Sequence, residues 1–111
     1  MNKIEKRQKF LEIVKEFNLV HKNDSEYTLP GARSTDFLIF YNDMNDEIQC
    51  AVNLRELFED YFNDVSDYSF GFQGIESLPP YKAKKRVIKI LKQYKQHLNN
   101  IKKLEMEKDF I

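Results

Sequence analysis

A stretch near the C-terminus that lacks glycine and proline sets the strongest limit on how this chain can fold. After Pro79 and Pro80 the chain has neither residue up to about position 106. Proline suits the first turn of a helix, and a helix over about 80–106 would be about 40 Å long at 1.5 Å per residue. In a chain of 111 residues, such a helix leaves room for one domain. Its apolar residues follow heptad-like steps of four and three: Val87, Leu91, Tyr94, Leu98 and Ile101.

A second helix is expected at the N-terminus. Asn2 and Glu5 have the spacing of a capping box, with Asn in place of Ser or Thr. Apolar residues recur at helical spacing from Ile4 to Phe17, which predicts a helix over about 3–18.

Strand patterns occupy two parts of the middle of the chain. The residues from Asp36 to Asn53 hold two β-favouring runs around a polar turn, which predicts a hairpin over about 36–53. Aromatic residues alternate with small or polar ones from Tyr68 to Gln73, which predicts a further strand over about 68–73.

Between these strands, an amphipathic pattern predicts a helix over about 53–64. Leu54, Leu57, Phe58, Tyr61 and Phe62 lie at helical spacing. The expected fold is therefore an α+β domain spanning 1–111, with the order α-β-β-α-β-α, a small antiparallel sheet and a long C-terminal helix.

Composition supports a folded, soluble protein. Hydrophobic residues make up 41% of the chain and aromatic residues 14%, which is enough for a core. The single Cys excludes an internal disulfide framework and fits a reducing compartment. No apolar run approaches the roughly 18–20 residues that a membrane span needs, and the charged N-terminal residues do not resemble a signal peptide. We expect a cytoplasmic protein that does not act at a membrane.

The formal net charge of zero conceals strongly opposed segments. Residues 1–23 hold six basic and three acidic residues, residues 24–76 hold two and twelve, and residues 77–111 hold ten and three. Such asymmetry indicates either charged partners or internal pairing between the segments.

Acidic residues cluster on the predicted helix at 53–64 and in the hairpin turn. A row of carboxylates at helical spacing could imitate a phosphate backbone and occupy the groove of a basic, nucleic-acid-processing protein. The competing interpretation is a solvated surface whose acids pair with the Lys-rich terminal helices. The candidate partner-binding residues are Asp43, Asp46, Glu47, Glu56, Glu59, Asp60, Asp64 and Asp67.

A row of lysines lies on one face of the predicted C-terminal helix. These side chains could hold a nucleic-acid backbone electrostatically, or they could serve as a solubilising outer face. Lysine lacks the bidentate fork with which arginine recognises bases and phosphates. The candidate nucleic-acid-binding residues are Lys85, Lys89, Lys92 and Lys103.

The sequence contains no signature of catalysis. His21 and His97 belong to no metal-binding spacing, and Cys50 falls on the apolar face of a predicted strand, where a buried thiol is typical. We therefore expect no enzyme, metal site or cofactor.

Three functions are consistent with the sequence. The first is a non-enzymatic inhibitor or regulator that binds a partner through the acidic surface; in composition the chain is similar to small phage-type inhibitors, such as anti-CRISPR or DNA-mimic proteins, and to antitoxin or immunity proteins. The alternative is a nucleic-acid-binding regulatory protein that uses the Lys-rich helix. A structural protein that forms homodimers through the seam of that helix is a third possibility.

Overall fold

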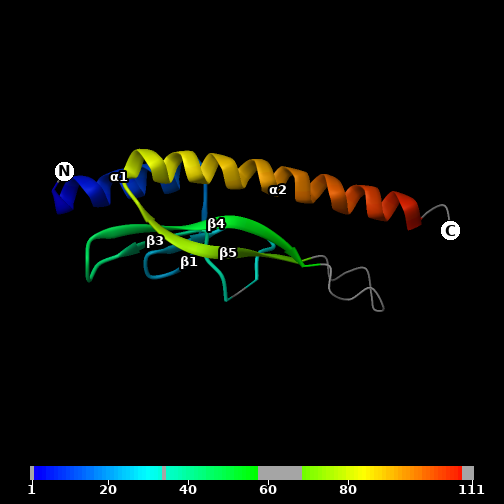
Figure 1. Cartoon of the computed structure of the whole chain (residues 1–111), viewed down its shortest axis with the longest axis horizontal. Coiled ribbons are helices and arrows are strands. Elements are labelled where there is room, and N and C mark those ends of the chain that lie inside the picture. The colour runs from blue at the N-terminus through cyan, green and yellow to red at the C-terminus, as the bar shows by residue number, and fades with distance from the viewer. Residues whose placement is uncertain (1, 34, 58–68, 109–111) are drawn as a thin grey trace.

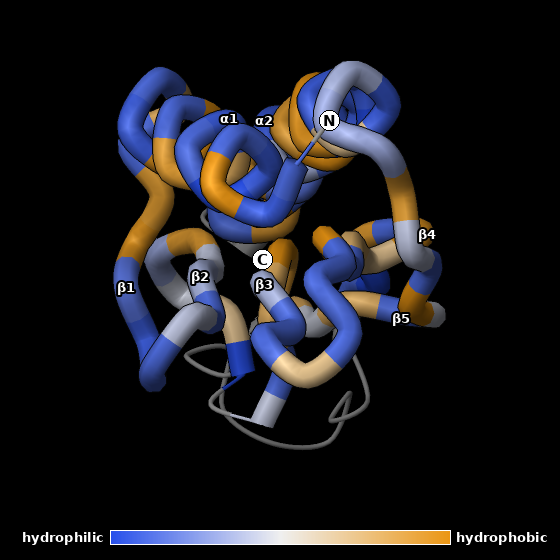
Figure 2. The backbone as a smooth tube through the Cα atoms, turned by 90° about the vertical axis from the view of Figure 1, so that its left-hand side faces the viewer, coloured by the Kyte–Doolittle hydropathy of each residue, from blue (hydrophilic) through white to orange (hydrophobic). Residues whose placement is uncertain are grey.

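Two helices lie on the same face of a five-stranded antiparallel sheet (Figure 1). The computed structural model describes residues 2–33, 35–57 and 69–108. The strands follow one another across the sheet in chain order, from β1 at one edge to β5 at the other (Figure 2). This arrangement confirms the predicted α+β class. The elements are α1 (Lys3–Glu16), β1 (Val20–Asn23), β2 (Glu26–Thr28), β3 (Ile39–Asn42), β4 (Glu47–Leu57), β5 (Ser69–Leu78) and α2 (Pro80–Lys108).

Helix α1 begins with the predicted cap. The Asn2 side-chain oxygen accepts a hydrogen bond from the Glu5 backbone N–H at 2.8 Å, and the Asn2 amide donates to the Glu5 carboxylate at 3.2 Å. The helix ends at Glu16, two residues earlier than predicted, and Asn18 adopts a left-handed conformation with φ 54°.

The sheet contains the predicted hairpin and a second one. Strands β3 and β4 pair from Asn42–Glu47 to Ile39–Cys50 around the polar turn, as expected. Strands β1 and β2 form a further hairpin that the sequence did not predict. Its strands have four and three residues, and both are too short and polar to give an alternating pattern.

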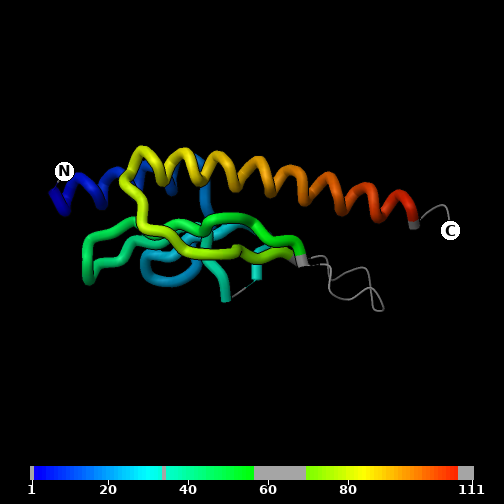
Figure 3. Tube along the Cα trace, viewed as in Figure 1, coloured from blue at the N-terminus to red at the C-terminus, as the bar shows by residue number. Residues whose placement is uncertain are grey.

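The predicted helix over 53–64 is wrong for residues 53–57. These residues continue β4, which runs beside β5 (Figure 3). Leu54 lies opposite Phe72, and Glu56 lies opposite Phe70. Leu54 packs against the core from within the strand, so pairing with β5 overrides the local helical pattern. Residues 58–64 of that prediction lie outside the described residues. Strand β5 confirms the predicted strand and extends it to Leu78.

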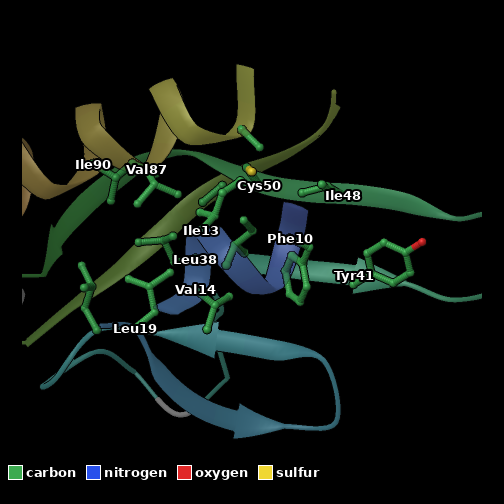
Figure 4. Packing of buried hydrophobic residues seen from close by; sticks show 14 of the residues in the cluster. Phe10, Ile13, Val14, Leu19, Leu38, Tyr41, Ile48, Cys50, Val87 and Ile90 are labelled. Atoms are coloured by element: carbon green, nitrogen blue, oxygen red, sulfur yellow. The ribbon is translucent and has the colours of Figure 1, made fainter. Parts of the chain in front are cut away.

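Helix α2 spans 29 residues, close to the predicted 80–106. Its buried side chains meet the sheet and α1 in the core, where Val87 and Ile90 lie near Cys50 (Figure 4). The buried row differs from the predicted seam. Ile90 and His97 are fully buried, whereas Leu98 is 42% exposed. The helix packs mainly onto β4. The face that meets β4 contains Ile90 and His97 and does not contain Leu98.

Candidate functional site

The acidic turn between β3 and β4 lies against helix α1. The Asp43 carboxylate accepts a hydrogen bond from the Arg7 guanidinium at 2.8 Å. Asp46 pairs with Lys3 at 3.7 Å, and its carbonyl accepts from the Lys6 ammonium at 2.8 Å. Burial and the nearby Asp46 charge raise the pKa of Tyr41, which lies beneath this cluster. The turn's negative charge is therefore met by the basic N-terminal helix.

The other described candidate acids also accept internal hydrogen bonds. Glu47 accepts from the Ser77 hydroxyl at 2.9 Å. Glu56 lies below α2, and its carboxylate accepts from the Asn100 amide at 3.0 and 3.2 Å and contacts His97 Nδ1 at 2.9 Å. Glu47 directly follows the turn as the first residue of β4. Glu56 lies near the other end of the same strand and faces α2, so the described acids do not all form one patch. Glu59, Asp60, Asp64 and Asp67 lie outside the described residues.

His97 is the buried polar residue that the sequence did not identify. Its side chain is 1% exposed and its ring centroid lies 5.0 Å from that of Phe70. Through their contacts with the Glu56 carboxylate, His97 and Asn100 link α2 to the C-terminal part of β4. The only sequence signal for His97 is its position seven residues after Ile90, which puts both on one helix face.

The remaining reactive side chain is buried. Burial raises the pKa of the Cys50 thiol to about 12, so the thiol stays protonated near neutral pH. Within residues 2–33, 35–57 and 69–108, no group of three or more His, Cys, Asp or Glu side chains is placed to hold a metal ion.

Lysine side chains lie exposed along one side of α2. The predicted residues Lys85, Lys89, Lys92 and Lys103 all belong to this row, and Lys82 extends it toward the start of the helix. From Lys85 to Lys103 the row is about 27 Å long at 1.5 Å per residue. We call these five residues the lysine row.

The lysine row has little internal compensation. Residues 80–104 contain nine basic residues and no acidic one. In α2, ion pairs within the described part of the chain involve Lys84 with Glu16, Arg86 with Glu76, and His97. Lys89 donates to the Val52 carbonyl at 3.0 Å, which does not neutralise its charge. Among the described residues, no carboxylate forms an ion pair with a lysine of the row.

A groove runs beside the lysine row, between α2 and the end of β5. It has a volume of about 570 Å³ and is lined from the helix by Lys82, Lys85, Arg86 and Lys89. Residues 76–79 form the other wall. Arg86 crosses the groove, donating to the Glu76 carboxylate at 2.5 Å and to the Ala51 carbonyl at 3.0 Å. Arg86 is therefore paired with an acid, whereas the lysines that line the groove form no ion pair with any residue that the structure describes.

Comparisons with known proteins give no match: no family model fits the sequence, and no curated protein or solved structure is significantly similar. Within the part of the chain that the structure describes, no helix is long and apolar enough to span a membrane.

Proposed function

We propose that this protein binds nucleic acid through the lysine row of α2 and contacts the phosphate backbone without reading base sequence. The observation that carries the proposal is the charge of residues 80–104, which hold nine basic residues and no acidic one. A polyanion that lies along the row would neutralise several lysines at once and release its condensed counterions.

The chemistry of the row favours phosphate contacts over base recognition. Bidentate contacts to guanine depend mainly on arginine, and Arg86, the one arginine of α2, is held by Glu76 and Ala51. Lysine acts as a flexible point charge and suits a phosphate of any sequence. The proposed binding is therefore independent of sequence and strongly dependent on salt.

Internal repulsion in α2 gives the proposal further support. Lys85 lies three residues after Lys82 and four before Lys89, so like charges are neighbours on the helix surface. Each such pair costs a few tenths of a kcal/mol in an isolated helix. The start of the helix carries no acidic residue in its first turn to complement its positive end. An anionic ligand would relieve both effects.

The acidic-surface inhibitor is the second candidate and has less support. Asp43, Asp46, Glu47 and Glu56 each accept a hydrogen bond or ion pair from a neighbouring element. A basic partner would have to compete with those donors. That proposal depends most on the four candidate acids outside the described residues.

Binding of a fluorescent 20-base-pair duplex, followed by anisotropy, tests the proposal. Lys85→Glu with Lys92→Glu should weaken binding at least tenfold in 50 mM salt. The matched control is Lys9→Glu with Lys15→Glu, which changes the net charge equally at exposed lysines of α1. The control should lose less than threefold. No binding by the unaltered protein, or equal losses in the two double variants, would exclude the lysine row as the binding site.

A further inference from the structure

Among the described residues, a loop covers the outer edge of strand β5 at one end, and no backbone group pairs with that edge at the other end. Near its start, a loop lies along the edge: the Arg33 N–H donates to the Phe70 carbonyl at 2.9 Å, and the Phe72 N–H donates to the Asp36 carboxylate at 3.1 Å. A Cβ atom at Gly71 would lie 2.2 Å from that carboxylate, so glycine permits this close cover. Gly74, with φ 77°, separates this half of the strand from the next.

The second half of the edge, residues 75–77, has outward-facing backbone groups. The Ala51 N–H donates to the Leu38 carbonyl at 2.9 Å, on the β3 side of β4. In an antiparallel ladder this alternation makes Ala51–Ile75 and Gln49–Ser77 non-hydrogen-bonded pairs between β4 and β5. The N–H and C=O groups of Ile75 and Ser77 therefore point away from the sheet. The Ile75 side chain is also 62% exposed.

The open edge lies beside the basic groove. Residues 76–78 belong both to β5 and to the wall of the groove opposite Lys82, Lys85 and Lys89. Glu76 already places one carboxylate against Arg86 in this groove. The outward backbone groups of β5 and the lysines of α2 thus face the same space. The backbone groups would bind a second strand, and the lysines would bind anionic groups; one ligand that carries both would contact both.

We propose that the groove accepts an extended acidic segment of a partner protein, which adds a strand beside residues 75–77 and places its carboxylates near Lys82, Lys85 and Lys89. A polypeptide offers the N–H and C=O groups that complete a strand edge, and pairing of this kind is a common mode of peptide recognition. A sugar–phosphate backbone offers no such pattern. Alternate residues of a strand project to one face about 7 Å apart, and Lys85 and Lys89 lie about 6 Å apart along α2.

This inference does not rest on nucleic-acid binding, although the two ligands would share Lys85 and Lys89. An acidic segment in the groove would therefore compete with nucleic acid for the lysine row. The two proposals differ in one structural requirement, since only the peptide needs the backbone of β5.

Two labelled ten-residue peptides test the inference by anisotropy in 150 mM salt. In the first, glutamate alternates with valine; in the second, it alternates with proline, which keeps the charge and removes half of the backbone donors. The valine peptide should bind at least tenfold more tightly. Equal affinity of the two peptides, or no binding of either, would overturn the inference.

A variant of β5 separates the peptide from nucleic acid. Ser77→Pro removes one outward N–H, and the control Ser77→Ala removes only the hydroxyl bond to Glu47. Ser77→Pro should weaken the valine peptide at least fivefold relative to Ser77→Ala and change duplex DNA binding by less than twofold. Equal peptide affinity in the two variants would contradict strand addition. If the unaltered protein binds the peptide but does not bind duplex DNA, only the proposed function is contradicted.

Amide hydrogen exchange on the unaltered chain provides a second readout that does not depend on how Ser77→Pro folds. The valine peptide should slow exchange at Ile75 and Ser77 at least tenfold, because their N–H groups become hydrogen-bonded. Duplex DNA should leave both rates unchanged. Unchanged rates with saturating peptide would exclude pairing at this edge.

Discussion

Both helices are basic, but they differ in how much charge they carry and in where it lies. Helix α1 has five basic and three acidic residues, and α2 has ten basic and two acidic residues. Helix α1 places Lys3, Lys6 and Arg7 against the acidic turn between β3 and β4, so these three side chains bind groups within the molecule. Helix α2 carries its lysine row exposed beside β5, where no described carboxylate pairs with Lys85 or Lys92. The comparison teaches that a neutral chain can contain both a satisfied charge pair and an open charged surface. Net charge alone does not distinguish them.

The position of α2 depends on its buried face, and the largest expected effect comes from breaking that contact. Ile90→Ala removes a fully buried side chain and should lower the free energy of unfolding by about 2–5 kcal/mol. Ile88→Ala, on the same helix but 37% exposed, is the matched control and should cost far less. Urea denaturation measures both. Similar losses in the two variants would mean that α2 does not pack on the sheet through this face.

Replacing Glu56 should have an intermediate effect on stability, because its carboxylate contacts the side of α2 that faces the sheet. Glu56→Ala leaves Asn100 and His97 without this acceptor and should cost about 1–3 kcal/mol of unfolding free energy. Glu76→Ala removes a more exposed carboxylate and serves as the control, with an expected cost below about 1 kcal/mol. A smaller loss for Glu56→Ala than for Glu76→Ala would reverse this ranking of the two sites.

The pair between α1 and the turn should contribute less. Asp43 and Arg7 are both about half exposed, with side-chain exposures of 57% and 51%. A double-mutant cycle with Asp43→Asn and Arg7→Gln should give a coupling of about 0.2–1 kcal/mol. Thermal unfolding at low and high salt measures it, and the coupling should shrink as salt rises. A coupling of zero at low salt would show that the charges of α1 are as unpaired as those of α2.

The lysine row should give the smallest effect, with the opposite sign. Lys85→Gln removes like-charge neighbours and should stabilise the protein by about 0.2–0.5 kcal/mol at low salt. Since Asp43→Asn should destabilise it under the same conditions, the two substitutions compare the two regions directly. Destabilisation by Lys85→Gln would indicate that this lysine is paired.

Local signals in the sequence predicted most of the elements. The Asn2–Glu5 cap, the alternation around the β3–β4 turn and the absence of glycine and proline after Pro80 each act over a few neighbouring residues. The exposed lysine row followed from helical spacing in the same way. These predictions agree with the structure because each depends only on residues that are close together in the sequence.

The failures have a common cause in contacts between distant residues. Residues 53–57 have the spacing of a helix, yet their pairing with β5 and the hydrogen bond from the Leu54 N–H to Gln93 hold them in a strand. Arg7 and Asp43 lie 36 positions apart, so their pairing has no local sign. The same applies to His97 and Glu56, which are 41 positions apart. The described candidate acids Asp43, Asp46, Glu47 and Glu56 thus each accept a hydrogen bond or ion pair from a distant part of the chain.

The salt dependence of duplex binding tests the central claim most directly. If Lys85, Lys89, Lys92 and Lys103 each neutralise one phosphate, log K should fall with log salt concentration with a slope of about −3.6, at 0.9 per phosphate. The slope should decrease in magnitude by about 2 when Lys85 and Lys92 are both replaced by Gln. A slope near zero, or the same slope in the unaltered and doubly substituted proteins, would contradict the account.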